Sequence, residues 1–200
     1  MKDSAALLVY WDGEASDISW PEPCIVEYVT NGQGGINSLS KGTIDAMMAD
    51  KNTSIYDLIG IGNIRKKYPP QTSTEKTVMQ TVIGDMMSAY PSESYGIIFG
   101  SHGSGWLPTI TGTRSIGQDG GRYSSDTALI PELAEVLRTV NPQKFDFVLF
   151  DACMMGCAEV YYELKDAARY CIASVLDIPA AGFPYASAVS YTHLRAHETK

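Results

Sequence analysis

Short apolar runs alternate along this chain with longer stretches whose apolar residues recur at helical spacing. Apolar runs of roughly four to eight residues predict strands when glycine, proline or polar residues bound them. By this criterion five segments are predicted strands: Ala5–Trp11, Cys24–Val29, Tyr95–Phe99, Phe145–Phe150 and Tyr170–Val175. The segment 55–64 mixes aliphatic residues with two glycines and predicts neither a strand nor a helix.

Four segments carry the pattern of helices: Lys41–Asp50, 72–90, Ile130–Val140 and Gly156–Ala168. The second is the clearest because its apolar residues follow the i, i+3, i+4 spacing of an amphipathic helix. They are Val78, Met79, Val82, Ile83, Met86 and Tyr90. We expect Thr72 or Ser73 to cap this helix and Pro91 to end it. Pro131 suits the first turn of the helix at Ile130.

In the second half of the chain, predicted helices and strands alternate as in the βαβ units of a parallel sheet. The 200 residues suffice for one α/β domain with a sizeable core. A polar, glycine-rich stretch from about Pro108 to Asp126 interrupts this alternation and predicts a long loop. Loops of that length tend to be functional.

Charge and composition exclude several classes of function. The net charge of −8 at pH 7 argues against a nucleic acid or an anionic membrane as partner. No run approaches the roughly 18 apolar residues of a membrane span, and the N-terminal apolar stretch is too short for a signal peptide. The sequence thus predicts a cytosolic protein or one whose true N-terminus lies upstream. The four cysteines, Cys24, Cys153, Cys157 and Cys171, do not form a dense disulfide pattern.

The chain ends in a string, VSYTHLRAHET, that resembles the in-frame translation of a transposon-end adapter used in sequencing libraries. We therefore expect residues 1–188 to form the domain and residues 189–200 to be a non-native tail. Two of the three histidines, His193 and His197, lie in that tail. No metal or catalytic role is expected of either, which leaves His102.

Two predicted strands each lead into an abrupt turn of small residues that holds a reactive side chain. The strand at 95–99 is followed by GSHG around His102, and the strand at 145–150 by DAC, which ends at Cys153. In open parallel sheets, ligands bind beyond the carboxyl ends of the strands. If these two strands are neighbours, the imidazole and the thiol meet in one cleft.

An imidazole beside a thiol suits nucleophilic catalysis. The thiolate is the attacking species, and a neighbouring imidazolium or helix N-terminus favours its formation. We expect Cys153 to have both, because a helix is predicted from Gly156. Acyl transfer also needs backbone N–H donors for the oxyanion. Gly103 and Cys153 are the candidates, and a glycine leaves room for the substrate carbonyl.

The two strand ends, SHGSGW in the first and FDACM in the second, resemble the clostripain family of cysteine peptidases, relatives of caspases, gingipains and legumain. The resemblance covers roughly residues 5–186 and is strong after residue 66. Further motifs that carry it are Tyr68-Pro69, Tyr90-Pro91, Ser94-Tyr-Gly96, Trp106-Leu-Pro108, Ser115-Ile-Gly-Gln-Asp119, Ile130-Pro-Glu-Leu133, Tyr162-Glu-Leu164 and Gly182-Phe-Pro-Tyr185. It implies a caspase-like α/β/α sandwich with a mostly parallel sheet.

The resemblance also implies roles for individual residues. His102 matches the general base and Cys153 the nucleophile of a cysteine endopeptidase. Asp151 matches the acid at the floor of the S1 pocket, which pairs with arginine or lysine at P1 of the substrate. The implied partners are proteins or peptides with such basic residues, and the implied location is secreted or surface-attached.

Family members are typically proenzymes that cleave themselves between the histidine and the cysteine. In that interval Arg114 and Arg122 lie in the polar loop and are preferred over Lys144 as processing sites. Some members need calcium, although no ligand cluster in this sequence decides the matter; no other cofactor is expected. The family's chain continues well past the cysteine, so we expect the fold to be incomplete at its C-terminus. Such a fragment can be inactive even where the whole protein is a protease.

Several of these residues also have a plain structural explanation. Trp106 either lines the cleft or packs, and Asp151 is also a suitable helix N-cap. Cys157, one helical turn after the nucleophile, would form a Cys-x-x-x-Cys redox or metal pair, but packing is the preferred role. Cys24 and Cys171 are expected to be inert core residues.

Two other functions fit part of the pattern. The sequence HGSG at His102 resembles the oxyanion-hole motif of serine hydrolases, but the chain has no Gly-x-Ser-x-Gly elbow. A non-catalytic, caspase-like binding module at a cell surface is the other alternative. The intact pair of His102 and Cys153 argues against it, because a degenerate member is expected to lose one of the two.

Overall fold

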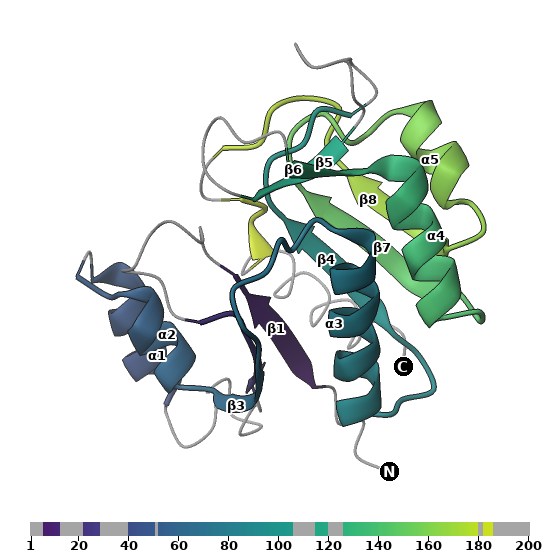
Figure 1. Cartoon of the computed structure of the whole chain (residues 1–200). Coiled ribbons are helices and arrows are strands. Elements are labelled where there is room, and N and C mark those ends of the chain that lie inside the picture. The colour runs from purple at the N-terminus through teal and green to yellow at the C-terminus, as the bar shows by residue number, and fades with distance from the viewer. Residues whose placement is uncertain are drawn as a thin grey trace, which may run out of the picture. The chain divides into compact units, whose positions relative to one another are not determined.

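The chain folds into two units, each built around its own three-stranded sheet (Figure 1). One unit comprises Met1–Glu93 with Gln118–Thr127, and the other comprises Ser94–Gly117 with Ala128–Lys200. The computed structural model describes residues 6–12, 22–28, 40–50, 52–105, 115–119, 126–179 and 182–185. The predicted non-native tail at 189–200 lies outside these residues.

The sheet of the first unit is antiparallel. It consists of β1 (Leu7–Trp11), β2 (Cys24–Tyr28) and β3 (Asn63–Lys67), with β2 in the centre. Every residue of β2 is buried, as expected of a central strand. Both strands predicted in this part of the chain are confirmed, and β3 with the preceding α2 (Ile55–Gly60) fills the segment that had no predicted structure.

Two further helices of this unit were predicted from the sequence. The first, α1 (Lys41–Ala49), begins after Ser40, whose hydroxyl accepts a hydrogen bond from the Thr43 N–H. The second, α3 (Lys76–Ala89), buries the middle of the apolar stripe that predicted it, namely Met79, Val82 and Ile83.

The predicted cap of α3 is wrong. Its N-cap is Glu75, which makes no side-chain capping bond, whereas Thr72 or Ser73 was expected. The reason is local, because residues 72–75 form a turn in which the Glu75 N–H donates to the Thr72 carbonyl at 3.1 Å. The helix therefore starts one turn later than the capping residues suggest.

The second unit contains the predicted parallel sheet. Its strands are β4 (Gly96–Gly100), β7 (Phe145–Asp151) and β8 (Ala168–Ala173), with β7 in the centre. The helices α4 (Ile130–Val140) and α5 (Ala158–Leu164) lie together on the same side of this sheet (Figure 1). The mixed α/β fold with a parallel sheet that the sequence predicts is confirmed.

The helix α4 forms as its pattern predicts. Pro131 stands in its first turn, and the apolar residues that recur along one face are buried: Ile130, Leu133, Ala134, Val136 and Leu137. On the central strand β7, Val148 and Phe150 are fully buried. Burial of this apolar surface is the main favourable term for the unit.

Two element predictions in the second half of the chain need correction. The stretch 108–126 is not a simple loop, because β5 (Ser115–Asp119) pairs with β6 (Asp126–Leu129) as a two-stranded ribbon. The helix predicted over 156–168 is only the seven-residue α5. The Ala167 N–H bonds to the Leu164 carbonyl at 2.8 Å, which closes the helix with a tight turn before β8 begins.

Candidate active site

His102 and Cys153 leave the parallel sheet at the same edge. The strands β4 and β7 are neighbours, as expected, and they run in register to their ends at Gly100 and Asp151. Beyond the strands, the Ser101 N–H still donates to the Asp151 carbonyl at 3.3 Å. Each of the two reactive residues follows its strand end by two positions, so the topology carries both to one edge.

The chain after His102 packs directly on the chain after Cys153. A Cβ atom on Gly103 would lie 2.7 Å from the Cys153 carbonyl oxygen and 2.9 Å from Sδ of Met155. A Cβ atom on Gly105 would clash with the Met154 carbonyl oxygen. Glycine at these two positions therefore lets two backbones approach with no side chain between them.

A bridge to β5 orients the backbone at Gly103. Gly103 pairs with Ile116, and the flanking hydrogen bonds run from Gly117 N–H to His102 C=O at 2.9 Å and from Ser104 N–H to Ser115 C=O at 3.1 Å. In an antiparallel bridge of this pattern, the N–H of the paired residue itself points away from the partner strand. The Gly103 N–H is thus directed away from β5.

The turn after Cys153 is unusual in its backbone conformation. Met154 has a φ of 61°, a left-handed value that non-glycine residues seldom adopt. Its N–H donates to the Leu176 carbonyl at 3.2 Å, and the Gly156 N–H donates to the Ser174 carbonyl at 2.7 Å. The segment that follows β8 therefore lies alongside residues 153–156 and holds the turn in place.

The same segment contacts the sulfur of Cys153. The Ile178 N–H lies 3.3 Å from Sγ, within the range of a hydrogen bond to sulfur, and the Cys153 side chain is partly buried. Sequence patterns did not point to Ile178, because the interaction uses its backbone and places no demand on its side chain.

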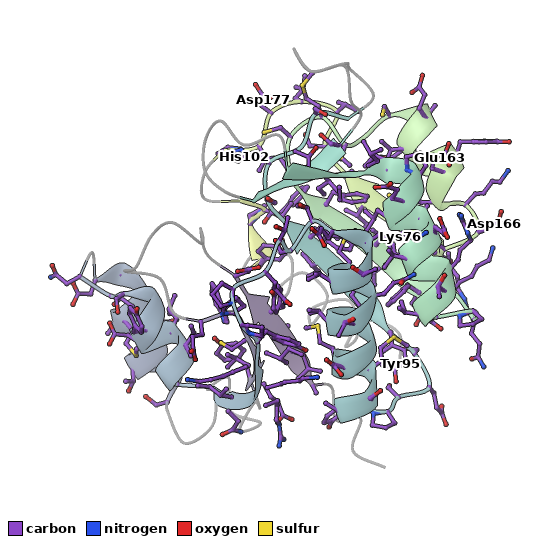
Figure 2. All side chains as sticks on the ribbon, in the orientation of Figure 1. Lys76, Tyr95, His102, Glu163, Asp166 and Asp177 are labelled. Atoms are coloured by element: carbon purple, nitrogen blue, oxygen red, sulfur yellow. The ribbon has the colours of Figure 1, made fainter. Side chains whose placement is uncertain are left out.

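His102 is exposed, and Figure 2 shows it and Asp177 beyond the carboxyl ends of the parallel strands.

Cys153 does not lie at the N-terminus of a helix, which corrects the sequence-based expectation. The helix α5 begins at Ala158, with Cys157 as its N-cap residue. The residues between Cys153 and α5 are tied to the segment after β8 and do not continue the helix. The backbone donor nearest the sulfur is therefore the Ile178 N–H and not a helix terminus.

The Asp151 carboxylate is held by the short segment 182–185. The Phe183 N–H donates to Oδ1 at 3.1 Å and to Oδ2 at 3.3 Å, and the Tyr185 hydroxyl donates to Oδ2 at 2.8 Å. Burial, followed by the hydrogen bond to Asp151, raises the pKa of Tyr185 to about 12. Asp151 is not a helix N-cap, because that position before α5 belongs to Cys157.

Of the two cysteines expected in the core, Cys24 is buried, whereas Cys171 is only partly buried. All four cysteines are free thiols, and Cys24 is buried in a cluster with Val26, Tyr28 and Ile59. Burial raises the pKa of Cys171 to about 11, so that it stays a thiol at neutral pH. Three residues predicted for the site or its processing, Trp106, Arg114 and Arg122, lie outside the described residues.

The described part of the chain offers no metal-binding group. No three His, Cys, Asp or Glu side chains among the described residues gather closely enough to hold a metal ion. In the same residues, no helix combines the length and the apolar character needed to cross a membrane.

The sequence model of the clostripain family matches residues 2–199. The chain belongs to this family. Among solved structures, this clostripain-family chain is similar to a secreted C11 cysteine protease from Bacteroides thetaiotaomicron in complex with an irreversible peptide inhibitor. The two share 33% identity with a TM-score of 0.62, and the match covers 90% of this chain and 41% of that one.

Two further solved structures are similar to the clostripain-family chain. One is an inactive zymogen C11 protease from Parabacteroides distasonis, with 28% identity, a TM-score of 0.61, and coverage of 90% of this chain and 40% of that one. The other is a secreted C11 cysteine protease from Bacteroides thetaiotaomicron called iotapain; at 23% identity and a TM-score of 0.62, with 86% and 43% covered, it supports the fold alone. The chain thus spans about two fifths of these proteases. Comparison with curated proteins gave no match.

Proposed function

We propose that the protein containing this chain is a cysteine endopeptidase in which His102 is the general base and Cys153 the nucleophile. The observation that carries this proposal is the in-register end of β4 and β7, which brings both residues to one edge of the sheet. Membership of the clostripain family supports the same activity. The reaction is acyl transfer through a thioester.

In the proposed reaction, His102 takes the proton of the Cys153 thiol, and Sγ attacks the carbonyl carbon of the scissile peptide bond. The carbonyl π electrons move to oxygen and form a tetrahedral oxyanion. Its collapse breaks the C–N bond, and the imidazolium of His102 returns the proton to the leaving amine. A water molecule, deprotonated by His102, then hydrolyses the thioester and regenerates the thiol.

We assign the backbone N–H groups of Gly103 and Cys153 as the hydrogen-bond donors that stabilise the oxyanion of this intermediate. The orientation of Gly103 supports its proposed role as a donor, because the bridge to Ile116 directs its N–H away from β5. Its missing side chain also lets the loop lie against Cys153. Removing one such donor costs an acyl-transfer enzyme roughly 100- to 1,000-fold in kcat.

We assign Asp151 as the carboxylate that binds a basic P1 side chain. Its position at the end of β7, two residues before the nucleophile, supports this assignment. Arginine at P1 forms charge-assisted hydrogen bonds with a carboxylate, and lysine a single strong ion pair. Trp106 is proposed to line the same cleft.

We further propose that the protein is made as a proenzyme and cut after Arg114 or Arg122. Both lie between the base and the nucleophile in the sequence. Cleavage there cuts the connection between β4 and β7 and leaves both strands intact. One solved relative is described as an inactive zymogen and another as secreted, which supports a proenzyme in a secreted or surface-attached setting. Mass spectrometry of the purified full-length protein would locate the cut.

The peptidase proposal is tested with a thiol-reactive peptide probe that carries arginine at P1. The full-length protein is expected to be labelled on Cys153, and His102→Ala is expected to slow labelling strongly. Cys157→Ala serves as the matched control, because this thiol lies close in sequence but outside the proposed chemistry. If Cys153 of the processed full-length protein reacts no faster than Cys157, the protein is a non-catalytic binding module.

A further inference from the structure

The two hydrogen-bond donors that hold Asp151 come from one short turn. The Phe183 N–H bridges both carboxylate oxygens, and the Tyr185 hydroxyl binds Oδ2 from the same side. An ionised carboxylate accepts about four hydrogen bonds, so these two donors leave part of its capacity, mainly at Oδ1, open to a ligand. The carboxylate is therefore fixed in orientation but not saturated.

The turn is itself shaped to fit the carboxylate. Gly182 has a φ of 73°, a value that suits glycine, and its Cα lies so close to Asp151 that a Cβ atom there would clash with Oδ2. The Gly182 N–H donates to the Pro179 carbonyl at 2.8 Å, and the Tyr185 N–H to the Phe183 carbonyl at 2.8 Å. The rings of Phe183 and Tyr185 meet edge to face with centroids 6.4 Å apart. These contacts hold the Tyr185 hydroxyl at a set position.

Tyr185 remains a hydrogen-bond donor under all ordinary assay conditions. Its pKa is raised to about 12, first by burial and then by the neighbouring Asp151, so the hydroxyl stays protonated across the working range of a protease. The Tyr185 hydroxyl is therefore available to donate to Asp151 throughout that range.

We propose that Tyr185 is a positioning residue for basic specificity: it fixes the Asp151 carboxylate in the orientation that receives a P1 arginine or lysine. This inference rests on the proposed peptidase function and names a specificity determinant within it. A carboxylate that is free to rotate would lose rotamer entropy when it binds a substrate, and this loss would weaken binding. The hydrogen bonds from Tyr185 and the Phe183 N–H restrict the Asp151 carboxylate before the substrate arrives. The residue acts through Asp151 and does not itself need to touch the substrate.

The test is a double-mutant cycle in the processed, full-length protein with Tyr185→Phe, Asp151→Asn and the double variant. Substrates are matched peptides with arginine, lysine or alanine at P1, and KM and kcat are measured separately. Alkylation of Cys153 by iodoacetamide, which has no P1 group, reports whether the rest of the site is intact. Tyr170→Phe, a 72% exposed tyrosine on β8, is the matched control.

Tyr185→Phe is expected to raise KM for both basic substrates about tenfold, as for loss of a hydrogen bond to a charged group, with kcat and alkylation little changed. In the Asp151→Asn background the same change is expected to have no further effect. An unchanged KM overturns the inference. A loss that slows alkylation equally, or that persists with Asn at position 151, also overturns it, because Tyr185 is then a structural support. A wild-type enzyme that cleaves its peptides without basic preference refutes the assignment of Asp151 instead.

Discussion

A Cβ atom on Gly103 would lie 2.7 Å from the carbonyl oxygen of Cys153, which is closer than real side chains approach such an atom. The residue after the proposed base and the proposed nucleophile itself are thus in direct backbone contact. Neither segment can move away freely. Gly103 also forms a β-bridge with Ile116, and the Met154 N–H donates a hydrogen bond to the Leu176 carbonyl. Glycine at position 103 is a condition for the geometry of the whole site.

Gly103→Ala is accordingly expected to disrupt the site. The added methyl group must displace the Cys153 carbonyl or Met155, which costs about 1–3 kcal/mol in the free energy of unfolding. Peptidase activity is expected to fall by a larger factor than stability alone explains, because the oxyanion donor moves with the chain. Gly100→Ala is the matched control, since a Cβ atom there meets nothing within 4 Å. Equal activity of the two variants would contradict the close packing.

The contact between Ile178 and Cys153 predicts an effect of a backbone change. Ile178→Pro removes the N–H that lies 3.3 Å from Sγ, whereas Ile178→Ala keeps it. We expect alkylation of Cys153 by iodoacetamide to slow about tenfold in the proline variant, because the attacking thiolate loses a hydrogen-bond donor. The alanine variant should react like the wild type.

A second measurement tests the same contact in the wild type, so that its result does not depend on the folding of the proline variant. In the wild type, the amide proton resonance of Ile178 is expected to shift when iodoacetamide alkylates Cys153, and to stay constant when Cys153→Ala is treated in the same way. An Ile178 amide that does not respond to alkylation of Cys153 would show that the sulfur is not its acceptor in solution.

In the first unit, Gly84→Ala is expected to stabilise the protein. Gly84 lies in the middle of α3, where a Cβ atom would meet nothing within 4 Å. Replacing a helix-interior glycine by alanine gains about 0.5–1 kcal/mol, mainly by restricting the unfolded chain. Gly62→Ala should have the opposite effect, because its Cβ would clash with Val26 and lie 3.2 Å from the Glu27 carbonyl oxygen. Thermal unfolding of the two variants gives the comparison.

The stability of the first unit is expected to depend on the ionisation of Asp85. Its carboxylate accepts hydrogen bonds from Lys66 Nζ and from the Tyr68 hydroxyl, the latter at 2.7 Å. Burial would raise the pKa of Asp85, but these two hydrogen bonds and the Lys66 charge together outweigh it and lower the pKa below its ordinary value. A lowered native pKa stabilises the fold above the ordinary value, and this contribution disappears as the pH falls through the lowered one.

The corresponding experiment compares the wild type with Asp85→Asn in thermal unfolding between about pH 6 and pH 2, a range that spans the ordinary aspartate pKa near 3.9. The wild type is expected to be the more stable protein at pH 6, and the gap should close below about pH 4. A gap that stays constant over this range would show that Asp85 stabilises the fold by packing and not by its charge.

Most of the second unit was predictable from the sequence because its signals are local and strong. The apolar periodicity gave α4 its observed bounds, Ile130–Val140, and short apolar runs located β4 and β7 within a residue or so at each end. The placement of His102 and Cys153 at one edge followed from a single assumption, that these two strands are neighbours. The rule that ligands bind beyond the carboxyl ends of parallel strands then predicted the position of the site.

The errors arose where tertiary contacts override local preference. The strand β5 has only one aliphatic residue, Ile116, and it forms because β6 and the bridge to Gly103 satisfy its backbone. The residues between Cys153 and α5 hydrogen-bond to the segment after β8 instead of continuing a helix, and Gly156 is the only residue among them that disfavours a helix locally. Backbone contacts of this kind, like that of Ile178 with Sγ, leave no pattern in side-chain types.

The paired ends of β4 and β7 also determine which changes of length the protein tolerates during evolution. Adding or deleting one residue within either strand would shift its register and turn the following residues toward the opposite face, so that His102 and Cys153 would no longer follow paired strand ends. Changes of length outside β4 and β7 leave this pairing in register, so the two strands should keep their lengths among descendants of this sequence.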